Sequence, residues 1–180
     1  NMPYTERDSV SPIGVYGKTK RSGELAVTNS DIDGIVIRTS WLYSAYGNNF
    51  VKKMLSLGND RDELEIIFDQ VGTPTNARDL AKACLDILLE KKDFNLNSNG
   101  AIYHYSNEGI ASWYDFAFDI MKLGDLDCKL KPIETKDYPT LARRPHFSVL
   151  NKSKIKKDFD ILIPNWRDSL KDCIEKIKNI

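Results

Sequence analysis

The amino-acid sequence predicts an α/β fold with a partly parallel sheet. Segments with apolar residues at helical spacing alternate along the chain with short apolar runs. These runs are continuous, as in Ile35-Val36-Ile37, which is typical of parallel strands covered on both faces. Hydrophobic residues make up 41% of the 180 residues, which is enough to bury a core, so we expect an ordered domain.

The first half of the chain predicts two helices and two strands after a polar start. Pro3 and Pro12 indicate a loop at the beginning, and Asn48 or Asn49 is a suitable N-cap for the second helix. In order, we expect a loop over 1–13, a helix over 14–29, a strand over 35–40, a helix over 50–57 that Gly58 ends, and a strand over 63–70.

The second half predicts three more helices, one more strand and a loop-rich stretch. Thr75 or Asn76 is a suitable N-cap, and Ser112 with Asp115 three residues later has the pattern of a capping box. Gly124 is expected to end the helix that follows. In order, we expect a helix over 77–89, a strand over 101–106, a helix over 113–123, a proline-containing loop region over 125–165, and a final helix over 166–178.

The charge balance argues against a nucleic-acid-binding protein. The 26 basic residues equal the 26 acidic ones, whereas nucleic-acid binders usually carry a basic excess. We interpret the one local basic run, Lys152–Lys157, as a solvated face. No apolar stretch reaches the ~18 residues that would span a bilayer, and the polar start "NMPYTERDSV" does not resemble a signal peptide. We therefore expect neither a nucleic-acid partner nor a membrane partner.

Cysteine and histidine usage predicts a reduced, cytoplasmic protein without a metal site. The three cysteines are odd in number and widely spaced, which argues against a disulfide framework. The two histidines, His104 and His146, are far from each other in the sequence and from any cysteine pair. We interpret both histidines as structural and expect no bound metal.

The stretch "SPIGVYGKTKRSGE", residues 11–24, contains the pair with the clearest chemical meaning. Tyr16 and Lys20 are four residues apart, which places them on the same face of a helix. A phenol can protonate the alkoxide that hydride addition to a carbonyl leaves, and an ammonium one turn away stabilises the phenolate. The spacing alone is a weak signal, because eight tyrosines among many lysines produce such a pair by chance. Lys20 could instead form a salt bridge with Glu24 across the next turn.

Longer segments of the sequence give a more specific signal than the spacing of Tyr16 and Lys20 alone. "SPIGVYGKTKRSGE" resembles the tyrosine–lysine segment of the extended short-chain dehydrogenase/reductases. "IRTSWLYSAYGNNFVKKML" followed by "FDQVGTPTNARDLA" is similar to one family within that superfamily, the dTDP-4-dehydrorhamnose reductases. "YPTLARRPHFSVLNKSKI" and "DFDILIPNW" resemble the C-terminal lobe of the same family. The resemblance covers nearly the whole chain, in the same order.

The resemblance implies the C-terminal part of a Rossmann-type NAD(P)-binding fold with a small substrate-binding lobe. Residues 1–40 would be a remnant of the Rossmann-like domain, and residues 41–180 would interleave the lobe with the remaining Rossmann elements, including the strand at about 101–106. The ten glycines form neither G-x-G-x-x-G nor G-x-x-G-x-x-G, the kind of pattern that cradles a pyrophosphate. The catalytic Ser or Thr of the family is also absent. We therefore expect the half that binds most of the cofactor to be missing from this chain.

The resemblance also implies roles for individual residues. Tyr16 would donate the proton, and Lys20 would assist it and bind the cofactor ribose. Thr39 and Ser40 would lie near the nicotinamide, at the C-terminal end of their strand. The residues expected to contact the substrate are Trp41, Asn48, Asn49, Gln70 and Arg144.

The residue types leave alternatives open for several of these substrate contacts. Trp41 is also suited to an ordinary core position, and Asn48 and Asn49 are also suited to helix capping. The guanidinium of Arg144 suits a diphosphate, yet Arg143 and Arg144 could form only a solvated pair.

The implied reaction of the full-length protein is the NADPH-dependent reduction of dTDP-4-dehydro-L-rhamnose to dTDP-L-rhamnose, and we expect this chain alone to be inactive. NADH remains open as the cofactor, because the choice is made in the missing half. A nucleotide-sugar epimerase of the same superfamily is one alternative. A non-catalytic reductase-like subunit is another, and the presence of both Tyr16 and Lys20 argues against it. We expect a nucleotide-sugar partner and a homo-oligomer.

Overall fold

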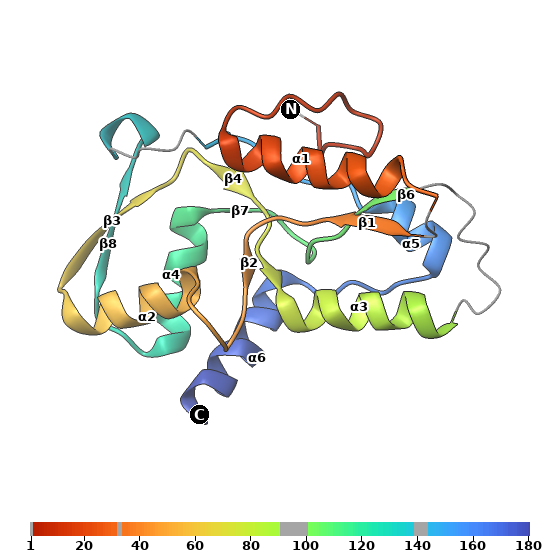
Figure 1. Ribbon diagram of the computed structural model, residues 1–180. Coiled ribbons are helices and arrows are strands. Elements are labelled where there is room, and N and C mark those ends of the chain that lie inside the picture. The colour runs from red at the N-terminus through yellow and green to blue at the C-terminus, as the bar shows by residue number, and fades with distance from the viewer. Residues whose placement is uncertain (1, 32–33, 91–100, 139–143) are drawn as a thin grey trace.

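The computed structural model describes residues 2–31, 34–90, 101–138 and 144–180, and it shows the predicted α/β fold (Figure 1). The helices in these ranges are α1 (Val15–Thr28), α2 (Phe50–Asp60), α3 (Ala77–Glu90), α4 (Trp113–Gly124), α5 (Ser153–Phe159) and α6 (Trp166–Lys178), with a 3₁₀ turn at Thr135–Asp137. The strands are β1 (Ile35–Arg38), β2 (Leu42–Tyr43), β3 (Glu63–Ile67), β4 (Val71–Gly72), β5 (Thr75–Asn76), β6 (Ala101–His104), β7 (Ala111–Ser112) and β8 (Lys129–Ile133). No helix in the described ranges combines the length and the apolar character needed to cross a membrane.

The described strands pair two by two. β1–β6, β2–β5 and β3–β8 are parallel pairs, and β4–β7 is antiparallel. Arg38 at the end of β1 is in register with His104 at the end of β6. The predicted parallel strands are therefore confirmed. The expectation that Ile35-Val36-Ile37 is covered on both faces is wrong, since the residues of β1 are only half-buried. α1, which packs on β1, contributes no buried residue.

The described residues form two clusters of buried apolar side chains. The smaller cluster surrounds β6 and includes Ile87 of α3, Tyr103 of β6 and Phe159 of α5. Figure 1 shows α1 and α3 on opposite sides of β1. The larger cluster joins α2, α4 and α6, and its fully buried aromatic residues include Phe116 and Trp166. The structure therefore has two separately packed apolar regions, and other contacts must fix the orientation of one region relative to the other.

The predicted helix caps are confirmed where the structure records cap contacts. The side chain of Asn49 accepts a backbone hydrogen bond at the start of α2, and Asn76 accepts one at the start of α3. Ser112 and Asp115 form the capping box of α4. Short polar side chains thus set three helix starts through bonds within a few residues, which is why the sequence revealed them.

The prediction that Gly58 ends α2 is wrong. The helix continues to Asp60, and Gly58 is buried inside it. A Cβ at Gly58 would lie 2.5 Å from the sulfur of Met121 and 3.0 Å from a methyl carbon of Leu126. The glycine is therefore explained by the close approach of α4 to α2 and not by a helix end.

The described part of the predicted loop region over 125–165 contains β8 and α5, neither of which the sequence predicted. β8 pairs with β3 in parallel, and α5 buries Ile155 and Phe159. Pro132 argued against a strand, but β8 has only β3 as a partner in the described residues, and proline is tolerated on a strand edge. α5 has only 7 residues, which is too short for a clear periodic pattern.

The interpretation of the basic run at the start of α5 as a solvated face is also wrong for two of its lysines. Lys152 donates to the backbone oxygen of Asn107 at 3.1 Å and lies 3.3 Å from the carboxylate of Glu108. Lys154 donates to the backbone oxygen of Ile102 at 2.7 Å, with its Nζ 4.1 Å from the centroid of the Tyr103 ring. Burial lowers the pKa of Lys152, and Glu108 opposes this effect.

Asn107, which follows β6, joins four segments of the chain. Its side chain is fully buried, and its Nδ2 lies 2.7 Å from Asp79 Oδ2, 3.0 Å from Ser169 Oγ and 3.2 Å from the backbone oxygen of Pro164. Its Oδ1 accepts the backbone N–H of Asn76 at 2.7 Å. One amide thus connects β5, α3, the end of β6 and α6, and lies between the two apolar clusters.

We expect Asn107→Ala to lower the free energy of unfolding by about 3 kcal/mol. The substitution leaves several buried polar groups without a partner, and each such group costs about 1–3 kcal/mol. Urea unfolding followed by circular dichroism measures the change. The matched control is Asn59→Ala, which removes an exposed asparagine of α2 and should stay within about 0.5 kcal/mol of the parent. Equal unfolding midpoints for the two variants would show that Asn107 does not join these segments.

Candidate active site

Tyr16 and Lys20 lie on the exposed side of α1. Tyr16 is 76% exposed, and the Nζ of Lys20 lies 5.6 Å from the centroid of the Tyr16 ring. The helix produces this arrangement, because side chains four positions apart lie one above the other. An ammonium at this distance is attracted to the face of an aromatic ring. The phenol is therefore open to a reactant and has a cation beside it.

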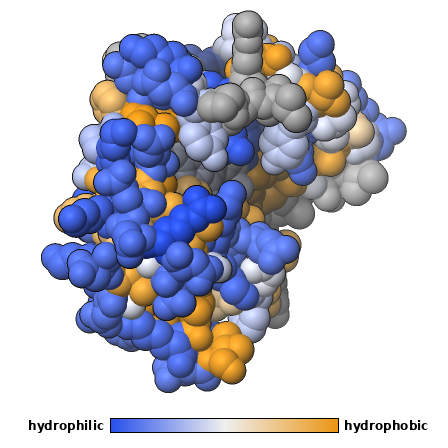
Figure 2. All heavy atoms as spheres, turned by 90° about the vertical axis from the view of Figure 1, so that its left-hand side faces the viewer, coloured by the Kyte–Doolittle hydropathy of each residue, from blue (hydrophilic) through white to orange (hydrophobic). Residues whose placement is uncertain are grey.

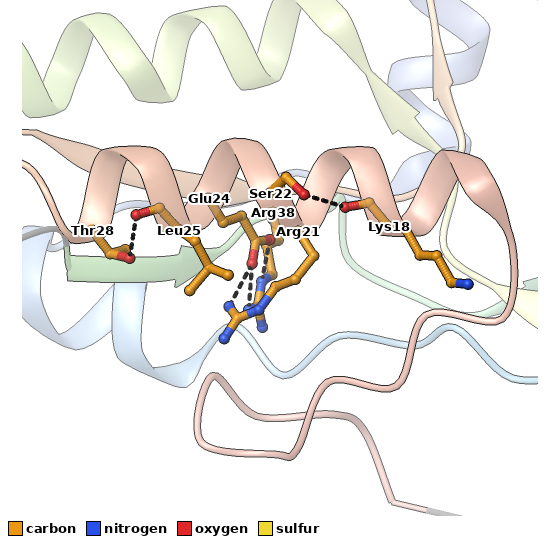
Figure 3. A network of polar contacts seen from close by, with 7 residues as sticks. All are labelled: Lys18, Arg21, Ser22, Glu24, Leu25, Thr28 and Arg38. Atoms are coloured by element: carbon orange, nitrogen blue, oxygen red, sulfur yellow. Dashed lines mark hydrogen bonds and ion pairs between the residues drawn. The ribbon is translucent and has the colours of Figure 1, made fainter.

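Glu24 is engaged by two arginines, so the structure does not form the salt bridge with Lys20 that the sequence left open. Its carboxylate accepts hydrogen bonds from Arg38 at 2.7 and 2.8 Å and from Arg21 at 3.0 Å (Figure 3). The hydrogen bonds from Arg38 hold the pKa of the Glu24 carboxyl below its usual value, although burial acts in the opposite direction. Lys20 lies over Tyr16 instead.

The segment after β1 carries three of the predicted site residues. Thr39 is exposed, and Ser40 Oγ donates to the backbone oxygen of Thr73 at 2.8 Å. Trp41 has a φ of 46°, in the left-handed region, and its backbone oxygen accepts the N–H of Thr75 at 3.1 Å. A bulky residue adopts this conformation only where its surroundings hold it. These contacts fix the direction of the chain as it leaves β1.

The indole of Trp41 is stacked on the indole of Trp113 from α4. The ring centroids are 3.6 Å apart and the ring planes differ by 8°. Gly72 of β4 makes room for this stack, because a Cβ there would lie 2.7 Å from Trp41 Cε2. Trp41 packs against the larger apolar cluster but is only half-buried. It thus combines a core contact with accessible aromatic surface, and its contact with a substrate stays a prediction.

Gln70 supports the stack from a buried position. It is 4% exposed, and its Oε1 accepts the indole N–H of Trp113 at 3.2 Å. Its Nε2 donates to Thr135 Oγ1 at 3.1 Å, and Thr135 in turn donates to Asp69 at 2.6 Å. Both ends of the Gln70 amide therefore bind protein groups. One of these groups is the indole of Trp113, which stacks on Trp41.

Asp69, Thr135 and Trp113 were not identified as site residues from the sequence. The two polar residues are 66 positions apart, and no local pattern connects them. The pairing of β3 with β8 brings them together, since each follows one strand of that pair. Burial would raise the pKa of the Asp69 carboxyl, but hydrogen bonds from Thr135 and the nearby His146 hold it below its usual value.

The two predicted asparagines have different surroundings. Asn48 is exposed. Asn49 is half-buried, and its Nδ2 donates to the backbone oxygen of Ser44 at 2.7 Å while its Oδ1 accepts the N–H of Lys52 at 3.3 Å. Asn49 therefore caps α2 and braces the preceding turn, whereas Asn48 presents its amide to the surroundings.

Arg144 is exposed and is the first described residue after the gap at 139–143. Arg143, its alternative companion in a solvated pair, belongs to residues 139–143 and lies outside the described residues. The backbone N–H of Val71 donates to the oxygen of His146 at 2.8 Å. This bond places His146 beside Val71 of β4, which is next in sequence to Gln70.

An open hollow of about 430 Å³ adjoins β4 and β7. Its lining consists of Phe68, Val71, Ile110, Ala111, Ser112, Tyr114, Asp115 and Pro132. Figure 2 shows the side of the molecule that carries β3 and β8, where apolar atoms are interspersed among hydrophilic ones. Neither Tyr16 nor Trp41 lines the hollow, so we do not assign it to the reacting part of a substrate.

The described residues include polar groups suited to a ribose but no Gly-rich turn suited to a pyrophosphate. Tyr16 and Lys20 offer a phenol and an ammonium to a nicotinamide ribose. The described glycines with a left-handed φ are Gly47 and Gly109, which belong to separate turns and make no Gly-rich cradle for a pyrophosphate. No cluster of three or more His, Cys, Asp or Glu side chains suited to a metal ion occurs in the described ranges.

Comparisons with known proteins match this chain to one family. The family model described as RmlD substrate binding domain matches residues 1–179. A dTDP-4-dehydrorhamnose reductase of Sinorhizobium fredii is 40% identical over 177 residues, covering 96% of this chain and 60% of that protein. A dTDP-4-dehydrorhamnose reductase of Escherichia coli is 37% identical over 186 residues, covering 98% of this chain and 60% of that protein.

Solved structures lead to the same family. The crystal structure of a dTDP-4-dehydrorhamnose reductase from Clostridium acetobutylicum matches with a TM-score of 0.89 and 40% identity, over 99% of this chain and 61% of that one. The enzyme of the same name from Bacillus anthracis, in complex with NADP, matches with a TM-score of 0.87 and 32% identity, over 97% of this chain and 59% of that one. The chain thus spans about 60% of the length of these relatives, and it belongs to the RmlD substrate binding domain family, together with the matching part of the dTDP-4-dehydrorhamnose reductases.

Proposed function

We propose that this chain is the proton-donating and substrate-binding part of an NADPH-dependent reductase that converts dTDP-4-dehydro-L-rhamnose to dTDP-L-rhamnose. The observation that carries the proposal is the exposed Tyr16 with the ammonium of Lys20 against its ring. Family membership supports the nucleotide sugar as substrate. The NADP complex of the Bacillus anthracis relative supports NADPH over NADH. An assembly of identical chains and a cytoplasmic location are part of the same proposal.

Tyr16 would supply the proton of the reduction. When bound, the cofactor supplies a hydride to the C4 carbonyl carbon of the sugar, and the C4 oxygen then carries negative charge. The Tyr16 hydroxyl protonates this oxygen, so that a C–H and an O–H bond form as the C=O double bond is reduced to a single bond. Lys20 stabilises the resulting phenolate, because its positive charge is one helical turn away. Its N–H groups also suit the diol of a ribose.

The remaining candidate residues would hold the sugar nucleotide. Thr39 and Ser40 lie at the end of β1, where open α/β sheets bind ligands. The accessible surface of Trp41 would pack against the substrate. Asn48 would add an amide contact, with Asn49 bracing the turn beside it.

Gln70 would position the aromatic stack and Arg144 would bind the diphosphate. The amide of Gln70 holds Trp113 under Trp41, so we assign it an indirect role in substrate binding. The exposure of Arg144 supports a role in binding an anionic group from solution.

The alternatives are less well supported. An epimerase of the same superfamily would use a similar pair, and a UDP-glucuronic acid 4-epimerase from Bacillus cereus shares the fold at 19% identity. The relatives at 40% and 37% identity are named reductases, which favours reduction. A non-catalytic subunit would have no need of an exposed phenol beside an ammonium.

We expect Tyr16→Phe in the full-length enzyme to reduce turnover by about 10²–10⁴-fold, because it removes the general acid. Folding and NADPH binding should be nearly unchanged, since the ring is exposed and only its hydroxyl is lost. NADPH oxidation with the keto-sugar measures the effect, and Tyr114→Phe is a matched control outside the proposed machinery. Turnover equal to that of the parent enzyme would contradict the assignment of Tyr16.

Arg144→Ala in the full-length enzyme should weaken nucleotide-sugar binding by about 1.5–3 kcal/mol, the usual range for a hydrogen bond to a charged group. The loss should appear mainly in KM if Arg144 binds the diphosphate equally in the ground state and the transition state. Titration calorimetry measures the affinity directly. Arg61→Ala removes another exposed arginine and should leave the affinity unchanged. Equal affinities for both variants would exclude a role for Arg144.

The 180-residue chain by itself should show no saturable NADPH binding at micromolar cofactor. In this proposal Tyr16 and Lys20 would contact only the nicotinamide ribose, and the described residues contain no Gly-rich pyrophosphate cradle, which supplies much of the affinity for a dinucleotide. Fluorescence titration with NADPH measures the binding, with the full-length enzyme as the positive control. Saturable micromolar binding by the 180-residue chain would require a phosphate site among its own residues.

A further inference from the structure

α1 is held on the sheet by charged side chains and not by an apolar face. No residue of α1 is buried. The half-buried residues of the helix are Gly17, Arg21, Glu24 and Thr28. They recur every three or four positions, so they form one face, and α1 packs on β1. The helix that carries Tyr16 therefore lacks the apolar stripe that usually sets the rotation of a surface helix.

Glu24 and Arg38 make a two-point contact between α1 and β1. Arg38 Nε lies 2.7 Å from one carboxylate oxygen of Glu24, and Nη2 lies 2.8 Å from the other. Arg21 adds a third bond at 3.0 Å. The side chains of Glu24 and Arg38 are only 14% and 18% exposed, which limits screening by solvent. A bidentate pair fixes orientation as well as distance, and Figure 3 shows the three side chains converging while Lys18 extends away.

The sheet end of this contact is itself well fixed. The backbone oxygen of Arg38 accepts the N–H of Tyr105 at 2.9 Å. Arg38 is in register with His104, whose backbone N–H donates to the carboxylate of Glu6 at 2.9 Å. Arg38 is thus a rigid support against which α1 can be oriented.

The two parts of the candidate site lie on the same side of this contact. The chain leaves the end of α1 and returns beneath the helix as β1, in the opposite direction (Figure 1). Tyr16 lies about two helical turns before Glu24, roughly 12 Å along the helix axis. Trp41 lies just after Arg38, roughly 10 Å further along an extended chain. Because α1 and β1 run in opposite directions, Tyr16 before Glu24 and Trp41 after Arg38 lie toward the same end of the molecule.

We propose that the Glu24–Arg38 pair, supported by Arg21, sets the position of Tyr16 and Lys20 relative to the segment from Thr39 to Trp41. Glu24 and Arg38 are then positioning residues for the reduction, an inference that rests on the proposed function. When the pair is broken, α1 keeps only partly exposed contacts with β1, and the helix shifts against the strand. A displacement of about 1 Å at a reacting group costs on the order of 10²-fold in rate.

The test uses the full-length reductase with Glu24→Gln, Arg38→Lys, the double variant and the control Lys18→Gln. We expect each single variant to lower kcat by about 10–100-fold, while KM for the keto-sugar stays within about 3-fold. The kcat of the double variant should be no lower than that of the less active single variant, because the two residues act as one unit. The inflection of the pH–rate profile should stay in place, since Tyr16 and Lys20 move together on one helix. Lys18→Gln should match the parent enzyme.

Activity is counted per folded site, from the number of sites that bind NADPH, so that partial unfolding is not mistaken for lost positioning. Glu24→Asp keeps the charge but shortens the side chain, and it should have an intermediate kcat even if Glu24→Gln does not fold. Unchanged kcat per folded site with only a lower melting temperature would overturn the proposal. A shifted pH–rate inflection would overturn it as well, since the pair would then act on the charge of Tyr16.

Tyr16→Phe in the same series separates this inference from the proposed function. If Tyr16→Phe keeps its turnover, the proposed function fails. If Tyr16→Phe loses turnover while the Glu24 and Arg38 variants keep theirs, only the positioning role fails.

Discussion

The hydrogen bonds of Asn107 are the constraint on which the rest of the structure depends. This buried amide lies where β6 ends and connects Asp79 of α3, Ser169 of α6 and the backbone of β5. The two apolar clusters on either side could pack in many relative orientations, because apolar contact has no preferred direction. Hydrogen bonds in a low-dielectric interior do have a direction, and leaving them unmade is costly. The amide therefore selects one arrangement of the two clusters, and with it the relation of β1–β6 to α4 and α6.

In the candidate site too, directional polar contacts fix the orientation of the elements, but here they do so near the surface and not in the core. The proposed role of Tyr16 requires an accessible phenol, and α1 accordingly contributes no buried residue but meets β1 through the bidentate contact of Glu24 with Arg38. Trp41 keeps accessible surface and stacks on one side against Trp113, whose indole N–H donates to Gln70. Each exposed chemical group thus rests on a polar contact that is itself shielded from solvent.

Much of the fold could be predicted because its signals are local. The helix starts at Asn49, Asn76 and Ser112 depend on side chains that bond to backbone groups within three residues, so the sequence shows them directly. Gly58 was misread because its reason lies in another helix, where Met121 needs the space of a missing side chain. β8 was missed because a strand that contains Pro132 becomes recognisable only beside its partner β3.

For the site, the sequence by itself determined the chemical groups: the spacing of Tyr16 and Lys20 on one helix, and the order of residues after β1. A helix fixes the i, i+4 relation through its own backbone, so no other part of the chain is needed to place a cation beside that phenol. Only the tertiary structure decided which partners those groups have. Glu24 could have bound Lys20 one turn away, but Arg38 approaches it from the sheet with two parallel hydrogen bonds, which a single flexible ammonium cannot match. The choice depended on where β1 ends relative to α1, and that position is set by the packing of distant segments and not by any local pattern.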